Sequence, residues 1–271
     1  MAEKFVSYAQ NFEDVMLNRV FGDLKSGFYI DVGACDPMID SVTHAFYSKG
    51  WSGINIEPTA RFYESLVKQR PRDTNLQLAV SNENKLLEFV TVENAGISSV
   101  DKGVLAKASE LGYATQTSKI QAITLKKLVQ DYCNTSDIHF LKIDVEGHEQ
   151  QVIEGADWVQ FRPWILIIEA VADANAQYMG APSWHQNVCD AGYVFAWFDG
   201  LNRFYVRQES AELLRHFDRP VNIFDHITLG KHHAWSYSPS IARRLFSQLL
   251  PAPAKAMLRS LATFVFGARL R

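Results

Sequence analysis

The sequence predicts an α/β fold: a mostly parallel sheet of seven strands, with helices on both faces and an antiparallel hairpin at the end. Short apolar runs alternate with helical stretches along residues 28–170, the pattern of consecutive βαβ units. Two further apolar runs, 193–198 and 203–206, flank a turn at 199–202, as in a hairpin. Together these observations indicate a Rossmann-like arrangement.

The individual elements follow from local periodicity and turn residues. An N-terminal helix is expected to begin with Ser7 as its N-cap and to end at Gly22 or Gly27. An inserted strand at 86–92 and a polar loop at 94–99 interrupt the alternation. The expected strands of the main sheet are 28–32, 52–57, 76–81, 138–143 and 164–169, and the expected helices are 37–50, 59–70, 124–133 and 149–160.

Composition limits the classes of protein to which the chain can belong. A formal net charge of −3 argues against a nucleic-acid binder. Three widely spaced cysteines without a CxxC pair fit a reducing compartment. The N-terminus lacks the apolar core of a signal peptide, and no apolar run reaches the ~18 residues that a spanning helix needs. We therefore expect a cytoplasmic protein, with any membrane association peripheral at the inner face.

Charge is unevenly distributed and divides the chain into a main domain, residues 1–235, and a tail, residues 236–271. The tail contains six basic residues and no acidic one. Beyond Pro253 its apolar residues recur at helical spacing, which predicts a short basic amphipathic helix. Two uses of this helix are open: packing on the main domain or a partner protein, and docking on an anionic membrane surface.

Four expected strands of the main sheet end in or near a carboxylate: Asp31, Glu57, Asp144 and Glu169. The carboxyl ends of parallel strands meet at one edge of a sheet, where ligands bind in open α/β folds. Clustered carboxylates repel one another and are best explained by a ligand with cationic or hydroxyl groups, or by a metal.

The turn after the first expected strand, Asp31–Cys35, has one glycine where a dinucleotide fingerprint has three. An acid beside a glycine turn suits a cationic group, and Glu57 follows at a distance suited to binding ribose hydroxyls. S-adenosylmethionine (SAM) carries an ammonium group, a ribose and an adenine. SAM is therefore the expected cofactor.

The polar turn 144–149 offers candidates for the base that removes a proton from an attacking hydroxyl: His148, Asp144 and Glu146. A zinc-protease HExxH motif is excluded because position 152 is valine. A divalent ion on Asp144, Glu146 and Glu169 remains an alternative, although no metal is expected. His148 is also suited to capping the following helix.

Five motifs occur in order along the chain: Ser7–Asp14, Phe28–Ala34, Gly53–Pro58, Asn94–Ser99 and Leu141–Glu149. Together they resemble the FkbM family of SAM-dependent methyltransferases. The resemblance covers roughly residues 5–170 and implies a class I methyltransferase fold and O-methylation, commonly of sugar hydroxyls in bacterial surface glycans or of polyketide-type products.

The resemblance also implies roles for individual residues. Asp31 and Gly33 would line the methionine part of SAM, and Glu57 would bind its ribose. The end of the third strand, Ala79, Val80 and Ser81, would border the adenine. Gln10 and Asp14 of the N-terminal helix would cover the cofactor. The acceptor would face Asp144, Glu146 and His148.

The leading hypothesis is a SAM-dependent O-methyltransferase that acts on a sugar hydroxyl in lipopolysaccharide or capsule synthesis, by direct in-line transfer with His148 or Asp144 as the base. One alternative is O-methylation of a small hydroxylated natural product, and another is a non-catalytic module with a SAM-binding fold. Five aromatic residues are candidates for stacking on sugar rings or for core packing: Trp184, Tyr193, Trp197, Phe198 and Trp235.

Overall fold

The computed structural model describes residues 4–92, 98–99, 115–170 and 180–236. The chain divides into two compact units, Met1–His233 and Ala234–Arg271. The expected tail helix and most of the polar loop 94–99 lie outside the described residues.

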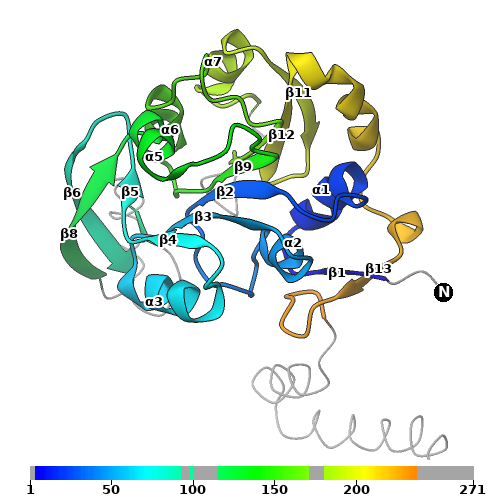
Figure 1. Cartoon of the computed structure of the whole chain (residues 1–271), viewed down its shortest axis with the longest axis horizontal. Coiled ribbons are helices and arrows are strands. Elements are labelled where there is room, and N and C mark those ends of the chain that lie inside the picture. Colours follow the sequence, from blue (N-terminus) through cyan, green and yellow to red (C-terminus); the bar gives the residue numbers. More distant parts are fainter. Residues whose placement is uncertain (1–3, 93–97, 100–114, 171–179, 237–271) are drawn as a thin grey trace, which may run out of the picture. The chain divides into compact units, whose positions relative to one another are not determined.

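A seven-stranded sheet is the centre of the first unit (Figure 1). The five strands β10-β9-β2-β3-β4 are parallel, and β12 and β11 extend the sheet as an antiparallel hairpin. The expectation of an α/β fold with a mostly parallel sheet is confirmed. In sheet order the strands are β11 (Tyr193–Phe198), β12 (Asn202–Arg207), β10 (Ile165–Glu169), β9 (Phe140–Ile143), β2 (Phe28–Val32), β3 (Ser52–Ile56) and β4 (Thr74–Leu76).

The sheet is buried on both faces because successive side chains of a strand point in opposite directions. On β2, Ile30 belongs to one apolar cluster and Tyr29 to another. Helices α5 (Leu125–Tyr132), α6 (Glu149–Glu154) and α7 (His185–Asp190) pack on the Ile30 face. Helices α1 (Glu13–Phe21) and α2 (His44–Ser48) pack on the Tyr29 face. The remaining α-helix is α3 (Ala60–Gln69).

The expected N-terminal helix starts later in the structure, and the expected helices 37–50 and 149–160 are shorter. Ser7 is not an N-cap: it ends strand β1 (Phe5–Ser7), and α1 follows Phe12, whose φ of 67° places it in the left-handed region. Gly22 ends α1 as expected. The stretches 37–50 and 149–160 are helical only over α2 and α6, because loops with local backbone hydrogen bonds occupy the rest.

The expected third strand, 76–81, is divided between two sheets. Leu76 ends β4 of the main sheet, whereas β5 (Ala79–Val80) pairs with β8 (Thr115–Ile123) in a second sheet. This four-stranded sheet also contains the expected inserted strand, β6 (Lys85–Val92), and β7 (Ser98–Ser99). Apolar periodicity gives no information about which neighbour a strand chooses.

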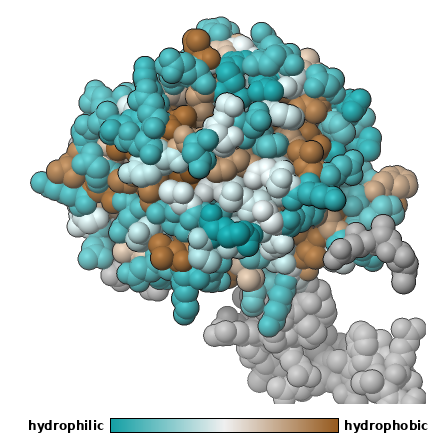
Figure 2. All heavy atoms as spheres, viewed as in Figure 1, coloured by the Kyte–Doolittle hydropathy of each residue, from teal (hydrophilic) through white to brown (hydrophobic). Residues whose placement is uncertain are grey.

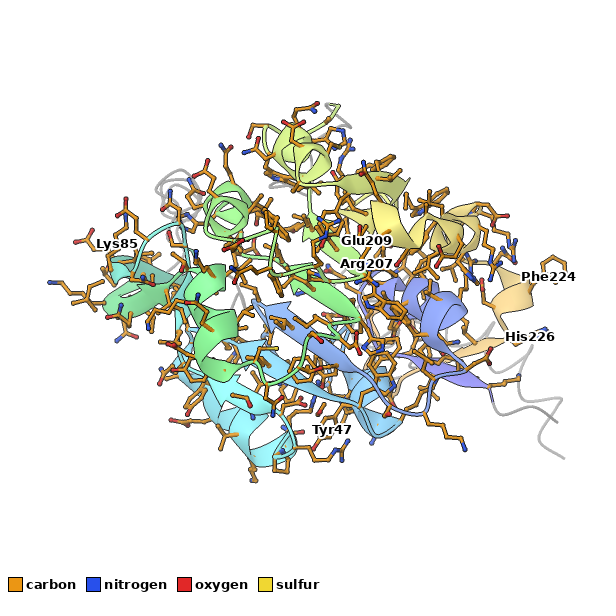
Figure 3. The ribbon with its side chains drawn as sticks, turned by 45° about the horizontal axis from the view of Figure 1, so that its top comes forward. Tyr47, Lys85, Arg207, Glu209, Phe224 and His226 are labelled. Atoms are coloured by element: carbon orange, nitrogen blue, oxygen red, sulfur yellow. The ribbon has the colours of Figure 1, made fainter. Side chains whose placement is uncertain are left out.

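The segment after the hairpin returns to the N-terminus. It contains the 3-10 helices η1 (Gln208–Phe217) and η2 (Ile223–Asp225) and strand β13 (Ile227–Leu229), which pairs in parallel with β1. Arg19 of α1 anchors η2 through an ion pair of 2.7 Å with Asp225. Phe224 and His226 extend from this edge of the unit, and Lys85 from the opposite edge (Figure 3). Elsewhere hydrophilic residues cover much of the face seen in Figure 2.

Candidate functional site

The carboxyl ends of four neighbouring strands lie level with one another. Residues 168, 143, 32 and 56 are register partners across β10, β9, β2 and β3. The residues that directly follow these four partners in the sequence are therefore Glu169, Asp144, Gly33 and Glu57, in that order across the sheet. Three of the four expected acids, Glu57, Asp144 and Glu169, lie along this edge, whereas Asp31 stands one residue before the end of β2 and is buried. We refer to Glu57, Asp144, Glu146 and Glu169 as the carboxylate rim.

Gly33 lies in the middle of this edge, where no side chain fits. Its φ is 82°, and a Cβ atom there would lie 1.8 Å from the carbonyl oxygen of Asp144. The Gly33 amide donates to Ile56 O at 3.0 Å, which holds the turn against β3. Only glycine allows both the positive φ and this close approach of two backbones.

Lys142 connects the residues of this edge, although the sequence analysis did not single it out. Its Nζ atom lies 3.1 Å from Asp144 Oδ2, 3.6 Å from Asp31 Oδ1 and 3.1 Å from Gly33 O. Burial acts to lower the pKa of Lys142, but Asp144 and Asp31 outweigh it and raise the pKa above its usual value. The sequence signal that indicates Lys142 is a lysine inside an apolar strand, because charged residues are rarely buried unless they are paired.

Asp31 lies beneath the carboxylate rim and not on its surface, since the residue is 1% exposed. Its Oδ2 accepts a hydrogen bond of 3.1 Å from the Thr43 hydroxyl. Its Oδ1 is buried and has no hydrogen-bond partner among the described residues, with Lys142 the paired cation. Burial raises the pKa of Asp31, and Lys142 and Thr43 counteract this effect.

Glu57 holds the backbone of two adjoining segments. One carboxylate oxygen accepts from the Cys35 amide at 2.9 Å and the other from the Thr59 amide at 2.7 Å. Glu57 therefore fixes the turn after β2 to the start of α3. Burial raises its pKa, while these backbone hydrogen bonds lower it.

The carboxylates after β9 and β10 shift one another's protonation. Burial, together with the charges of Asp144, Glu146 and Glu149, raises the pKa of Glu169 to about 10, and Glu169 is hydrogen-bonded to Asp144. Burial and Asp144 raise the pKa of Glu146 to about 7. At neutral pH, Glu169 therefore holds a proton, and Glu146 lies near the midpoint of its titration.

His148 contacts the end of the second sheet. It precedes α6, where its side chain makes no capping hydrogen bond, and its Nε2 lies 3.0 Å from the hydroxyl of Ser81. The turn before it is shaped by Glu149, which accepts hydrogen bonds from the Val145 and Gly147 amides. Ser81 directly follows Ala79 and Val80 of β5, and of these three residues Ser81 contacts His148 while Val80 is buried in the core.

The N-terminal residues have roles that the sequence analysis did not assign. Asp14 accepts hydrogen bonds from Ser7, Tyr8 and Ala9, so it fixes the connection between β1 and α1. Gln10 is exposed in that connection.

Glu13 is the buried acid that joins the N-terminal segment to the hairpin. It accepts a hydrogen bond of 2.6 Å from Asn202 of β12, the register partner of Glu169. Burial and the nearby Asp199 raise the pKa of Glu13 to about 8.

The alternative metal site, the polar cavity and two of the aromatic candidates do not add to the carboxylate rim. Within the described ranges, no group of three His, Cys, Asp or Glu side chains is arranged to hold a metal ion. A polar cavity of about 390 Å³, bordered by Phe28, Ser52 and Thr74, opens at the opposite, amino-terminal ends of the strands. Trp184 and Tyr193 are buried in the core.

Comparison with known families agrees with this geometry. Residues 31–195, more than half of the chain, match the model of the methyltransferase FkbM domain. The chain belongs to the FkbM methyltransferase family. The resemblance inferred from the five motifs is thus confirmed, and the protein is a methyltransferase.

The matched FkbM domain includes the carboxylate rim, Lys142 and the whole second sheet. The N-terminal segment, with Glu13 and Asp14, and the returning segment after residue 195 lie outside it. No curated protein gives a significant match to the chain. No helix within the described part of this FkbM protein is long and apolar enough to cross a membrane.

Proposed function

We propose that this FkbM protein is a SAM-dependent O-methyltransferase, and that the edge around Gly33 binds the donor. The observation that carries this proposal is the half-buried Gly33 turn, which places backbone without a side chain level with the ends of three other strands. In class I methyltransferases, which have a Rossmann-like sheet of this kind, such an edge receives the cofactor.

The side chains around the turn fit the groups that SAM carries. Among the described residues, no donor lies within hydrogen-bond distance of the buried Asp31 Oδ1, and the nearest cation, Lys142 Nζ, is 3.6 Å away. The ammonium group of SAM, bound near Gly33, would supply a donor and a further positive charge. We assign ribose binding to Glu57 and the adenine border to Ala79, Val80 and Ser81, while Gln10, fixed through Asp14, would cover the donor.

The rim residues would bind the acceptor hydroxyl and remove its proton. When bound, SAM supplies an electrophilic methyl group, so the chain needs a base but no nucleophile of its own. Glu146 is the strongest candidate, because a pKa of about 7 suits a base near neutral pH. Asp144 would hold the acceptor hydroxyl, and His148 would fix the turn through Ser81.

A carbohydrate hydroxyl is the acceptor that we propose, in the synthesis of a bacterial surface glycan. Several carboxylate oxygens lie side by side on the rim, and such a set of acceptors suits a molecule with many hydroxyl groups. We further propose that the enzyme works in the cytoplasm, and that residues 236–271 contact the inner membrane face or a partner protein.

Calorimetry with SAM and transfer of a tritiated methyl group test these proposals separately. We expect the wild-type chain to bind SAM and to label a glycan extract but not the low-molecular-weight fraction. Label in the small-molecule fraction alone would overturn the sugar assignment, and no SAM binding would overturn the donor assignment. Repeating the transfer with a chelator would reveal any need for a metal.

A further inference from the structure

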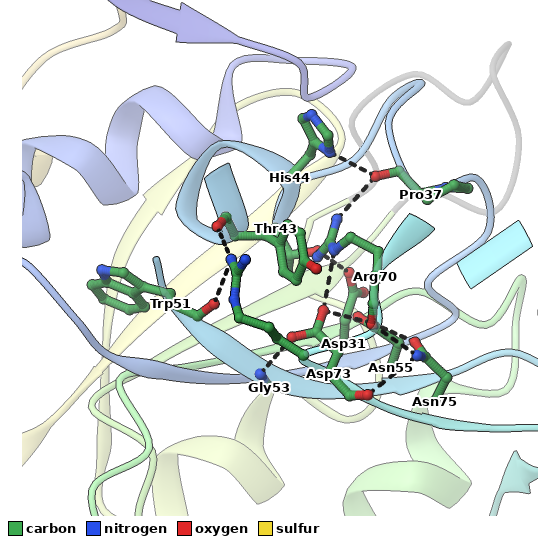
Figure 4. A network of polar contacts seen from close by, with 12 residues as sticks. Asp31, Pro37, Thr43, His44, Trp51, Gly53, Asn55, Arg70, Asp73 and Asn75 are labelled. Carbon is green, nitrogen blue, oxygen red and sulfur yellow. Dashed lines mark hydrogen bonds and ion pairs between the residues drawn. The ribbon is translucent and has the colours of Figure 1, made fainter. Parts of the chain in front are cut away.

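A buried arginine outside the carboxylate rim connects to it through hydrogen bonds. Arg70, at the end of α3, is 1% exposed. Its guanidinium donates to Asp73 at 3.1 Å, Pro37 O at 2.9 Å, Tyr29 Oη at 2.9 Å and Thr43 Oγ1 at 2.8 Å (Figure 4). Four hydrogen bonds in different directions hold the guanidinium in one orientation.

The direction of the Thr43 hydrogen bonds follows from donor chemistry. A guanidinium can only donate, so the Thr43 oxygen accepts from Arg70 and keeps its single proton for another partner. That partner is Asp31 Oδ2, at 3.1 Å. An ionised carboxylate can only accept, so Thr43 donates to Asp31 at 3.1 Å, which is shorter than the 3.4 Å between Thr43 Oγ1 and the other nearby hydroxyl, Ser41 Oγ.

The contacts that begin at Arg70 continue from Asp31 to the Gly33 loop, where the donor is proposed to bind. The Thr43 contact leaves Asp31 Oδ1 directed at Lys142, whose ammonium group also holds the Gly33 carbonyl oxygen at 3.1 Å. Arg70 holds the other side of the same loop directly, through Pro37 O. Two branches from one side chain thus fix the loop that follows β2.

We propose that Arg70 and Thr43 are positioning residues that orient Asp31 and the Gly33 loop for binding of the donor. The inference rests on the proposed function, in which this loop binds SAM. Neither residue touches the donor in this account. Their contribution is to keep the Asp31 carboxylate ionised and correctly turned.

Thr43→Val tests the proposal, because valine has nearly the same shape but no hydroxyl. Replacing Arg70 itself would leave Asp73 buried without its cation and endanger folding. We expect Thr43→Val to remain folded and to bind SAM at least tenfold more weakly in calorimetry, the effect of losing a hydrogen bond to a charged group. Thr43→Ser, which restores the hydroxyl, should recover most of the affinity.

The pH dependence of SAM affinity separates positioning from a general loss of stability. The charged groups that face Asp31 are Lys142 and Asp144 from the β9 side and Arg70 from α3, and Thr43 adds a neutral donor from the start of α2. The Thr43 hydrogen bond lowers the pKa of Asp31. Its loss should therefore move the decline of affinity in acid to a higher pH.

Ser210→Ala is the matched control, since this buried hydroxyl also accepts from an arginine, Arg207, at 2.8 Å. We expect it to leave both SAM affinity and its pH profile unchanged. Wild-type affinity and an unshifted pH profile in Thr43→Val would overturn the positioning role. Absence of SAM binding by the wild type would instead refute the proposed function.

Discussion

Asp31 of β2 and Lys142 of β9 are register partners on adjacent parallel strands, and their charged groups lie 3.6 Å apart. Both residues are almost fully buried, at 1% and 8% exposed. Burying charge is costly unless each group is paired, so the two residues depend on one another. The same lysine holds Asp144 and the Gly33 carbonyl oxygen, which makes it the link between the core of the sheet and the carboxylate rim.

Replacing Lys142 by methionine should strongly destabilise the fold. The change leaves Asp31 buried without its cation, and breaking a buried pair in this way costs about 3–5 kcal/mol. Urea denaturation measures the loss. Lys126→Met is the control, because the Lys126–Asp157 pair is largely exposed on the lysine side and should contribute little to stability. Equal losses in the two variants would contradict the role assigned to Lys142.

Gly33→Ala should abolish donor binding, whereas Gly200→Ala should not. Both glycines have positive φ, at 82° and 101°, so both variants carry a backbone penalty of about 1–2 kcal/mol. A Cβ at Gly200 meets nothing within 4 Å, but one at Gly33 would meet Asp144 O at 1.8 Å and force the edge apart. Thermal unfolding and SAM calorimetry of both variants check this prediction. Similar SAM affinities would show that the close approach is irrelevant to binding.

Glu169→Gln should flatten the dependence of stability on pH. The folded protein keeps a proton on Glu169 up to a pKa of about 10, above the ordinary value of 4.5. Between these values the folded state binds more protons than the unfolded state, so the free energy of unfolding falls as pH rises, by up to roughly 1.4 kcal/mol per pH unit. Glutamine resembles the protonated acid and does not titrate. Denaturation at pH 5 and pH 8 should show that the free energy of unfolding falls less between these values in the variant than in the wild type. An equal fall in both proteins would refute the raised pKa of Glu169.

Methyl transfer should depend on ionised Glu146. With a pKa of about 7, the base form increases through neutral pH, so kcat/KM should rise with pH up to about 8 and then level off. Glu146→Gln should reduce turnover roughly 100-fold or more while SAM still binds.

Two other variants complete the assignment of the base. Glu154→Gln, on the exposed side of α6, controls for the loss of a nearby charge and should keep full turnover. If His148→Ala rather than Glu146→Gln abolishes transfer, histidine is the base.

Local patterns were sufficient to predict much of the fold. Apolar runs with polar ends predicted the central strands, and the turn at 199–202 predicted the hairpin. The prediction of Ser7 as an N-cap was wrong: a serine a few residues before an acidic pair resembles an N-cap, but Ser7 belongs to β1, which pairs with β13 over 200 residues further on. Such long-range pairing leaves no local periodicity to detect.

The sequence by itself determined that acids end or directly follow three of the parallel strands and that a fourth carries Asp31 one residue before its end, and parallel strands must bring those ends to one edge. It also determined that a glycine stands between them, which together with the five motifs identifies the family. Only the tertiary structure decided that Asp31 lies beneath the rim, that Lys142 contacts both Asp31 and Asp144, and that hydrogen bonds connect Arg70 through Thr43 to Asp31. These relationships depend on side chains from distant elements meeting at distances near 3 Å, and no spacing along the chain encodes such meetings.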